Sequence, residues 1–217
     1  VLRATHMLVG NPEFYNLPRK YKICITGCRS WCCYPEINDV GLSATKRVRN
    51  GEEEIGFSLR VAGGLSSEPF FARSLNAFVQ WNQVPDVILG VTRIFRDADV
   101  LRQHRERARL KYLFKQHGWT DESFQTELER RIGFRLDPSE PEEVPGDIYR
   151  DHVGIHRQKQ SGYYYVGGSV SRGRITPDQM LAAANLADSF ASGEIRTTAN
   201  QNLVIVNVPE RHVEAVA

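Results

Sequence analysis

Three cations, Arg19, Lys20 and Lys22, stand within four residues immediately before an apolar stretch. Setting them against a buried strand is costly unless an anion neutralises them. If residues 21–25 are extended, Lys20 and Lys22 point to one face while Arg19 and Tyr21 point to the other, because side chains alternate along a strand. Two converging ammonium groups predict an anion site. The alternative is an edge strand whose lysines guard it against aggregation.

The four cysteines of the chain form a second group with possible chemistry, since Cys24, Cys28, Cys32 and Cys33 lie within ten residues. Crosslinks at that spacing cannot staple a fold of 217 residues. We therefore expect reduced thiols or a metal role rather than disulfides.

A third group consists of Arg102, Arg105 and Arg109, at positions i, i+3 and i+7. On a helix from about Val100 to His117 these guanidinium groups would fall along one face. Two interpretations stay open. The face is either solvated, with Glu106 relieving some of the repulsion, or it lies against an anionic cofactor.

The amino-acid composition of the chain argues against some classes of function. The chain has a net charge of +2, with 41% hydrophobic and 25% charged residues, as is typical of a globular protein. Bulk capture of nucleic acid needs a much larger basic excess, so we expect no nucleic-acid partner. We also expect no membrane span and no secretory signal, hence a cytoplasmic protein. The first residue is Val1 rather than Met, which suggests a start within a longer protein.

The elements that must position these groups can be predicted from periodicity. Residues 36–42 and 55–61 predict two strands of a hairpin, joined by the polar segment 44–54. Helices are predicted from Ser67 to about Val79, from Pro85, from about Val100 to His117, and over 121–132 with Gly133 as the stop.

The second part of the chain has a different pattern. Residues 136–147 are acidic and contain three prolines, which predicts a linker over 136–150. Strands are predicted over 163–170, 194–198 and 203–208. Thr176-Pro177-Asp178-Gln179 predicts the start of a helix that ends at Gly193. The fold class is therefore α+β.

Six segments in one order carry a resemblance to the nitrite/sulfite reductase family of sirohaem and iron–sulfur enzymes. They are residues 16–22, 36–41, 56–65, 102–113, 154–160 and 195–203. The resemblance implies a sirohaem-binding α/β domain with a mixed sheet, from the first of two repeats, over 1–135. It also implies a ferredoxin-like half-domain of the second repeat over 151–217.

For the site, the resemblance implies that Lys20 and Lys22 line the distal face of the sirohaem and hold the anionic substrate. Cations there can bind an oxyanion and help to deliver protons. Sirohaem carries eight carboxylates, and these need several charge-assisted partners. For Gln201 and Asn202 a polar turn between strands stays open as the alternative. The implied cofactor-binding residues are Arg105, Arg109, Lys159, Gln160, Arg196, Thr198, Gln201 and Asn202.

The family's 4Fe-4S cluster needs four thiolates, and the resemblance implies that they lie outside this chain. Gly27-Cys28-x3-Cys32 has the spacing of half of the cluster motif, but a Cys-x5-Cys pair is missing. We expect structural thiols or adventitious zinc there, and no metal ligand is assigned.

The implied reaction is the six-electron reduction of sulfite to sulfide or of nitrite to ammonia. Lys22 favours sulfite, whereas residues 156–162 resemble the nitrite branch, so both anions stay open. The implied electron donor is a ferredoxin or a flavoprotein. The alternative is a cofactor-free, inactive fragment of such an enzyme.

Overall fold

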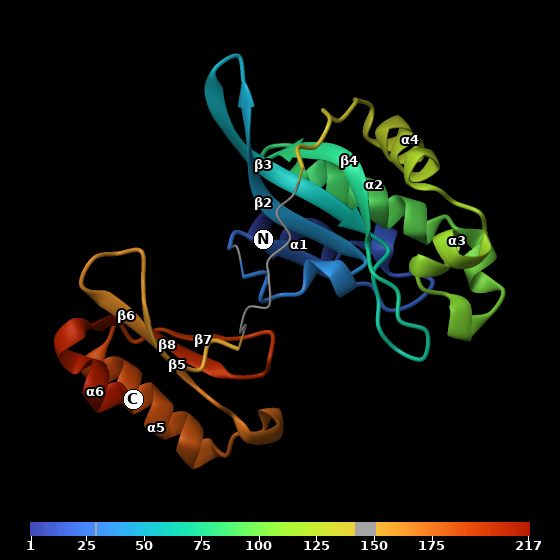
Figure 1. Cartoon of the computed structure of the whole chain (residues 1–217). Coiled ribbons are helices and arrows are strands. Elements are labelled where there is room, and N and C mark those ends of the chain that lie inside the picture. The colour runs from blue at the N-terminus through green and yellow to red at the C-terminus, as the bar shows by residue number, and fades with distance from the viewer. Residues whose placement is uncertain (29, 142–150) are drawn as a thin grey trace. The chain divides into compact units, whose positions relative to one another are not determined.

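The structure is a computed structural model that describes residues 1–28, 30–141 and 151–217. The chain divides into two compact units, Val1–Pro145 and Gly146–Ala217 (Figure 1). Each unit has a sheet and helices of its own, and each is described by itself. None of the helices in the described ranges is long and apolar enough to cross a membrane.

The first unit is built on a mixed sheet of four strands in the order β1-β2-β3-β4. The strands are β1 (Ile23–Thr26), β2 (Val40–Arg49), β3 (Glu52–Val61) and β4 (Arg73–Gln80). Strand β1 runs parallel to β2, and the other neighbours are antiparallel. The predicted mixed sheet of an α+β fold is confirmed.

The predicted hairpin is also confirmed, but its turn is tighter than expected. Strands β2 and β3 pair over their whole length, from Val40 opposite Val61 to Arg49 opposite Glu52. Only Asn50 and Gly51 connect them, with φ of 54° and 82°. Positive φ at both central residues is what a two-residue hairpin turn requires. The polar segment 44–54 is therefore mostly strand rather than loop.

The helix predicted from Ser67 to Val79 is wrong, because this region forms strand β4. Leu75, Ala77 and Val79 alternate with less buried residues at the start of the strand and are at most 1% exposed. Pairing with β3 satisfies the backbone of this segment, and that long-range pairing overrides a local helix signal.

Helices α1 (Leu2–Leu8), α2 (Val84–Arg96), α3 (Lys111–Gln116) and α4 (Asp121–Ile132) complete the first unit. The predicted starts of α2 and α4 are confirmed, and Gly133 caps α4 with φ 80°. Gly90 allows α2 and α4 to approach closely, since a Cβ there would lie 2.6 Å from Ile132. The buried face of α2 comprises Val87, Ile88, Val91, Ile94 and Phe95.

The predicted helix from Val100 to His117 is wrong. The chain forms short 3-10 turns over Asp99–Arg102 and Arg105–Arg107, and only α3 is helical. His104 is extended, with φ −135° and ψ 110°, and breaks the segment. Burial of Leu101, Ala108 and Leu110, each at most 1% exposed, decides this path. The three arginines therefore do not share one helix face.

The first residues of the predicted linker lie against the first unit. Leu136 is buried, and Phe78 donates its backbone N–H to the Asp137 carbonyl over 2.7 Å. The Asp137 carboxylate pairs with Arg47 at 2.6 Å and with Arg49 at 3.0 Å. The rest of the predicted linker, 142–150, lies outside the described residues.

The second unit is an antiparallel sheet in the order β5-β6-β8-β7, packed against helices α5 (Pro177–Phe190) and α6 (Val213–Val216). The strands are β5 (Gly154–Arg157), β6 (Tyr163–Gly168), β7 (Ile195–Thr197) and β8 (Leu203–Pro209). The predicted capping box of Thr176 and Gln179 is confirmed. Helix α5 ends at Phe190, and the Gly193 N–H donates back to the Ala187 carbonyl. The structure adds strand β5, which the sequence pattern did not predict.

Candidate functional site

The segment that carries Lys20 and Lys22 lies directly before β1, which begins two residues later than predicted. Lys22 is tied by its backbone: its N–H donates to Asp39 Oδ2 over 2.8 Å, and its carbonyl accepts from the Val40 N–H over 3.1 Å. Tyr21 stacks on Phe95 with 5.3 Å between ring centroids. Lys20 and Lys22 flank this aromatic residue in the sequence. Lys20 is exposed, and Lys22 is half-buried.

An ion pair between Asp39 and Arg109 lies beside Lys22. Arg109 Nη2 donates to Asp39 Oδ2 over 2.9 Å and Nε to Oδ1 over 3.3 Å, which makes the contact bidentate. The Asp39 side chain is 0% exposed and that of Arg109 is 11% exposed. Burial raises the pKa of Asp39 above its ordinary value, although Arg109 acts in the opposite direction. The buried Asp39 carboxylate therefore binds the guanidinium group of Arg109 and the backbone N–H of Lys22.

The charges around Lys22 destabilise its own ammonium group. Burial lowers the pKa of Lys22, and the nearby charges of Arg109 and Lys20 lower it further against the attraction of Asp39. The structure thus brings Lys22 and Arg109 together at a single carboxylate, and Lys20 lies near enough to Lys22 to affect its charge. Such an excess of positive charge attracts an anion, and a lysine with a lowered pKa gives up a proton more readily.

Lys111 is a further buried cation that the sequence analysis did not identify. It is 1% exposed, and its Nζ donates to the carbonyls of Leu65, over 2.9 Å, and Glu68. Burial lowers its pKa, and Arg109 and Lys115 add to this effect. Since two of its hydrogen bonds go to carbonyls of one loop, Lys111 fixes the chain after β3, and it adds charge beside Arg109.

The sequence does contain signals that could have identified Asp39 and Lys111. Asp39 is a carboxylate inside the predicted strand 36–42, just before Val40 and Leu42, and Lys111 lies among the apolar residues of the stretch 110–114. Charged residues inside apolar runs are costly and usually paired. The pattern does not reveal which distant residue is the partner.

Arg105, predicted beside Arg109, has a different place. It lies in the 3-10 turn Arg105–Arg107 with an exposed side chain, and its carbonyl accepts a hydrogen bond from Arg19. Its backbone therefore fixes Arg19, while its side chain faces solvent. Of the two arginines predicted on this segment, only Arg109 takes part in the buried cluster.

In the second unit, the predicted residues Thr198, Gln201 and Asn202 belong to the turn between β7 and β8. The Thr198 hydroxyl accepts from the N–H groups of Asn200 and Asn202, both over 3.2 Å. Asn202 is 8% exposed, and its Oδ1 accepts from the Val170 N–H over 2.9 Å. Gln201 is exposed and adopts φ 64°. The alternative of a polar turn, left open for Gln201 and Asn202, therefore describes what Asn202 does here, and Thr198 stabilises the same turn.

Arg196 lies on the edge strand β7 with an exposed side chain, and it pairs with Glu194 at 2.6 Å. Lys159 and Gln160 are exposed in the connection between β5 and β6, next to the end of β8. Strand β6 separates this connection from the β7–β8 turn. A strand of that length spans about 17 Å. Within the second unit, Lys159 and Gln160 are therefore at the opposite end of the sheet from residues 198–202.

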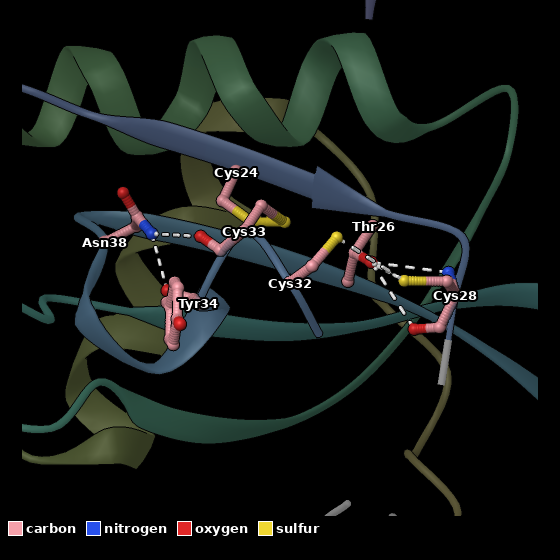
Figure 2. Close-up of a disulfide and its surroundings, with 7 residues drawn as sticks. All are labelled: Cys24, Thr26, Cys28, Cys32, Cys33, Tyr34 and Asn38. Atoms are coloured by element: carbon pink, nitrogen blue, oxygen red, sulfur yellow. Dashed lines mark hydrogen bonds between the residues drawn. A yellow bond between two sulfur atoms is a disulfide. The ribbon is translucent and has the colours of Figure 1, made fainter. Parts of the chain in front are cut away.

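The expectation of reduced cysteines is wrong for one pair. Cys24 of β1 and Cys33 are joined by a disulfide (Figure 2). The Sγ atoms of Cys28 and Cys32 lie 3.8 Å apart. Among the described residues there is no group of three or more His, Cys, Asp or Glu side chains that could hold a metal ion.

The chain thus combines a mixed-sheet unit that holds a buried Asp39–Arg109 pair with a small α+β unit, and both units match known families. Residues 2–136 match the family described as "Nitrite and sulphite reductase 4Fe-4S domain". Residues 156–217 match the "Nitrite/Sulfite reductase ferredoxin-like half domain". The chain belongs to the nitrite and sulfite reductase family, which is a family of iron–sulfur oxidoreductases.

Three relatives illustrate the range of the family. An assimilatory ferredoxin-dependent nitrite reductase of Haloferax mediterranei is 37% identical over 89% of this chain and 35% of its own length. A chloroplastic ferredoxin–nitrite reductase of Oryza sativa is 36% identical over 95% and 34%. A ferredoxin sulfite reductase of Mycolicibacterium paratuberculosis is 37% identical over 96% and 36%.

A solved structure, that of the NirA protein of Mycobacterium tuberculosis, matches with a TM-score of 0.88 and 35% identity. The match covers 100% of this chain and 38% of the NirA chain. The chain therefore spans little more than a third of the length of the relatives it matches.

Proposed function

We propose that this chain is the part of a sirohaem-dependent reductase that binds nitrite or sulfite during its six-electron reduction. In this proposal the first unit is the sirohaem-binding domain of a first repeat. The second unit is a ferredoxin-like half-domain of the second repeat. The observation that carries the proposal is the cation cluster in which Lys22 and Arg109 meet at Asp39 and Lys20 lies near Lys22.

The cluster fits an anionic ligand because its positive charge is not balanced locally. Among the described residues, neither Lys20 nor Lys22 forms an ion pair through its ammonium group, whereas Asp39 is fully used by Arg109 and the Lys22 N–H. The cluster therefore has two ammonium groups and one guanidinium but only one buried carboxylate. A small oxyanion or a cofactor carboxylate would supply the missing negative charge.

The chain's own residues would act in two ways. Lys20 and Lys22 bind the oxyanion and stabilise the negative charge that develops as electrons arrive. Lys22, whose pKa is lowered by burial and by Arg109, donates protons to the oxygen atoms that leave as water. Asp39 holds Lys22 in place through its backbone N–H and holds Arg109 beside it. Sirohaem, when bound, supplies the iron that holds the substrate and passes it the electrons.

The residues of the second unit fit a cofactor contact unequally. Arg196 and Gln201 are exposed, and a guanidinium and an amide can bind a macrocycle carboxylate. The side chains of Thr198 and Asn202 already accept hydrogen bonds from their own turn. We therefore expect Arg196 and Gln201 to contribute more to cofactor binding than Thr198 and Asn202.

The relatives' names support a ferredoxin as the electron donor, and a flavoprotein is the alternative. Their names divide between nitrite and sulfite, so the substrate is to be decided by assay. The cytoplasmic location stays a prediction.

The test is turnover of the complete protein that carries this chain, with a chemically reduced dye as donor and nitrite or sulfite as substrate. Lys20→Met and Lys22→Met should each lower kcat/KM by about 100-fold, because each removes a cation from the developing charge. Lys46→Met is the matched control, since Lys46 is an exposed lysine paired with Glu53 on the hairpin. Wild-type turnover in both cluster variants would contradict the proposal.

The second candidate function is a folded, cofactor-free and inactive fragment. The absorbance of the purified protein separates the two. Bound sirohaem gives a coloured protein with intense visible bands. A complete protein that stays colourless after reconstitution would favour the inactive alternative.

A further inference from the structure

The loop between β1 and β2 holds a second pair of cysteines that the proposed function does not use. Cys28 and Cys32 are separated by three residues, and their Sγ atoms are 3.8 Å apart (Figure 2). Cys28 is exposed and Cys32 is half-buried. Two sulfur atoms at van der Waals contact need to move by less than 2 Å to reach the roughly 2 Å length of an S–S bond. A side-chain rotation at the exposed cysteine covers that distance.

Contacts at both ends of the loop hold the two cysteines close to each other. At one end, the Thr26 hydroxyl lies 3.3 Å from the Cys28 N–H, from which it accepts, and 3.4 Å from Cys28 Sγ. At the other end, Cys32 is followed by Cys33, which the disulfide ties to Cys24 in β1. The Cys24–Cys33 bond therefore keeps Cys32 beside the strand from which Cys28 emerges.

The environment of Cys28 also favours the reactive form of its sulfur. Burial by itself raises the pKa of the Cys28 thiol. Hydrogen bonds with the Thr26 hydroxyl and with the backbone and thiol of Cys32 outweigh this and bring it below its ordinary value. The thiolate is the nucleophile in thiol–disulfide exchange, and exposure gives an oxidant access to it.

We propose that Cys28 and Cys32 form a reversible redox site, in which Cys28 is attacked by a low-molecular-weight disulfide and Cys32 resolves the product. The Cys28 thiolate attacks the oxidant's S–S bond, forms a mixed disulfide and releases one small thiolate. The Cys32 thiolate then attacks the Cys28 sulfur and releases the second. In total the two protein thiols lose two electrons and two protons, and the small disulfide is reduced to two thiols.

A metal site is the competing use of the same sulfur atoms, and the geometry favours it less. Structural zinc takes four ligands, and two of the four cysteines are already consumed by the disulfide. The described residues offer no group of three His, Cys, Asp or Glu side chains for a metal. The redox site needs only the pair that is already in contact, and it does not depend on the proposed reductase function.

The experiment counts accessible thiols on the wild-type chain after equilibration with oxidised glutathione, by alkylation and mass spectrometry. Trypsin cuts after Lys22, Arg29 and Lys46, so the linked peptides 23–29 and 30–46 carry all four cysteines. We expect two alkyl groups on this pair before oxidation and none after it. Dithiothreitol at low concentration should restore the two groups before it opens Cys24–Cys33. Two alkyl groups that persist in oxidised glutathione would overturn the proposal.

Two variants assign the roles. Cys32→Ser should trap glutathione on Cys28 as a stable mixed disulfide. Cys28→Ser should lower the rate of glutathione incorporation at least tenfold. Thr26→Val, which replaces the hydroxyl with a methyl group, should slow the wild-type reaction several-fold and leave its end point unchanged. Equal glutathione incorporation in the two serine variants would reject Cys28 as the attacking thiol. Protection of both thiols that a chelator removes would identify a metal site and reject the redox site.

Discussion

Arg109 of the first unit and Arg196 of the second were both predicted to bind the same cofactor, yet the structure holds them very differently. Arg109 forms a bidentate pair with Asp39 that buries both side chains. Arg196 pairs with Glu194, two residues away, and its side chain remains 66% exposed. One pair joins residues 70 positions apart, and the other is local.

The contrast indicates two ways to present positive charge to a ligand. A buried pair fixes the geometry of the site before the ligand arrives, at a desolvation cost that the rest of the fold offsets. An exposed pair contributes little to stability and leaves the side chain able to rearrange. We infer that Arg109 presents a guanidinium in a fixed position, whereas Arg196 presents one that can rearrange.

The largest expected effect comes from breaking the buried pair. Asp39→Asn should lower the free energy of unfolding of the first unit by about 3 kcal/mol, because it leaves the buried Arg109 without a counter-charge. Urea denaturation followed by tryptophan fluorescence measures this unit selectively, since Trp31, Trp81 and Trp119 all lie in it.

Glu194→Gln is the matched control for that prediction. It removes the carboxylate partner of the exposed Arg196, so the free energy of unfolding of the second unit should change by less than about 0.5 kcal/mol. Equal losses from Asp39→Asn and Glu194→Gln would remove the distinction between the two units.

A smaller effect is expected from the turn of the second unit. Asn202→Ala removes the acceptor of the Val170 N–H and should destabilise this unit by about 1 to 2 kcal/mol. Far-UV circular dichroism should show the loss, while the tryptophan transition of the first unit stays in place. A variant that folds normally but loses sirohaem affinity would instead favour a direct cofactor contact for Asn202.

The smallest expected change in stability concerns Lys22. Its pKa in the folded protein is lowered from 10.5, so between that lowered pKa and 10.5 the unfolded chain binds the proton more tightly. Wild-type stability should therefore rise with pH across this window. Below the window the charged Lys22 costs stability. At pH 7 the free energy of unfolding of Lys22→Met should be equal to or greater than that of the wild type.

Urea denaturation at pH 7 and at pH 10 measures this difference, with Lys46→Met as the exposed control. The stability advantage of Lys22→Met over wild type should shrink towards pH 10. A large loss of stability at pH 7 would mean that Lys22 is a structural residue rather than a strained functional one.

Much of the fold was predictable from local pattern. Helices α2, α4 and α5 follow from their apolar periodicity and from the start and stop signals at Pro85, Gly133 and Thr176, and the β2–β3 hairpin follows from alternation. The segments 67–79 and 100–117 were mispredicted. Pairing with β3 decided the conformation of the first segment, and burial of isolated apolar residues decided that of the second. Neither effect can be recognised from a short stretch of sequence.

The features of the candidate site also separate into those that local sequence predicts and those that only the packing of distant segments reveals. The sequence alone determined that Lys20 and Lys22 flank Tyr21 directly before an apolar stretch, and that the four cysteines share one short segment, because these facts depend on spacing. Only the tertiary structure selected Asp39 as the partner of Arg109, joined Cys24 to Cys33 and placed Lys159 away from the β7–β8 turn. Such choices depend on which distant segments pack together, and packing is settled by the buried surface of the whole unit.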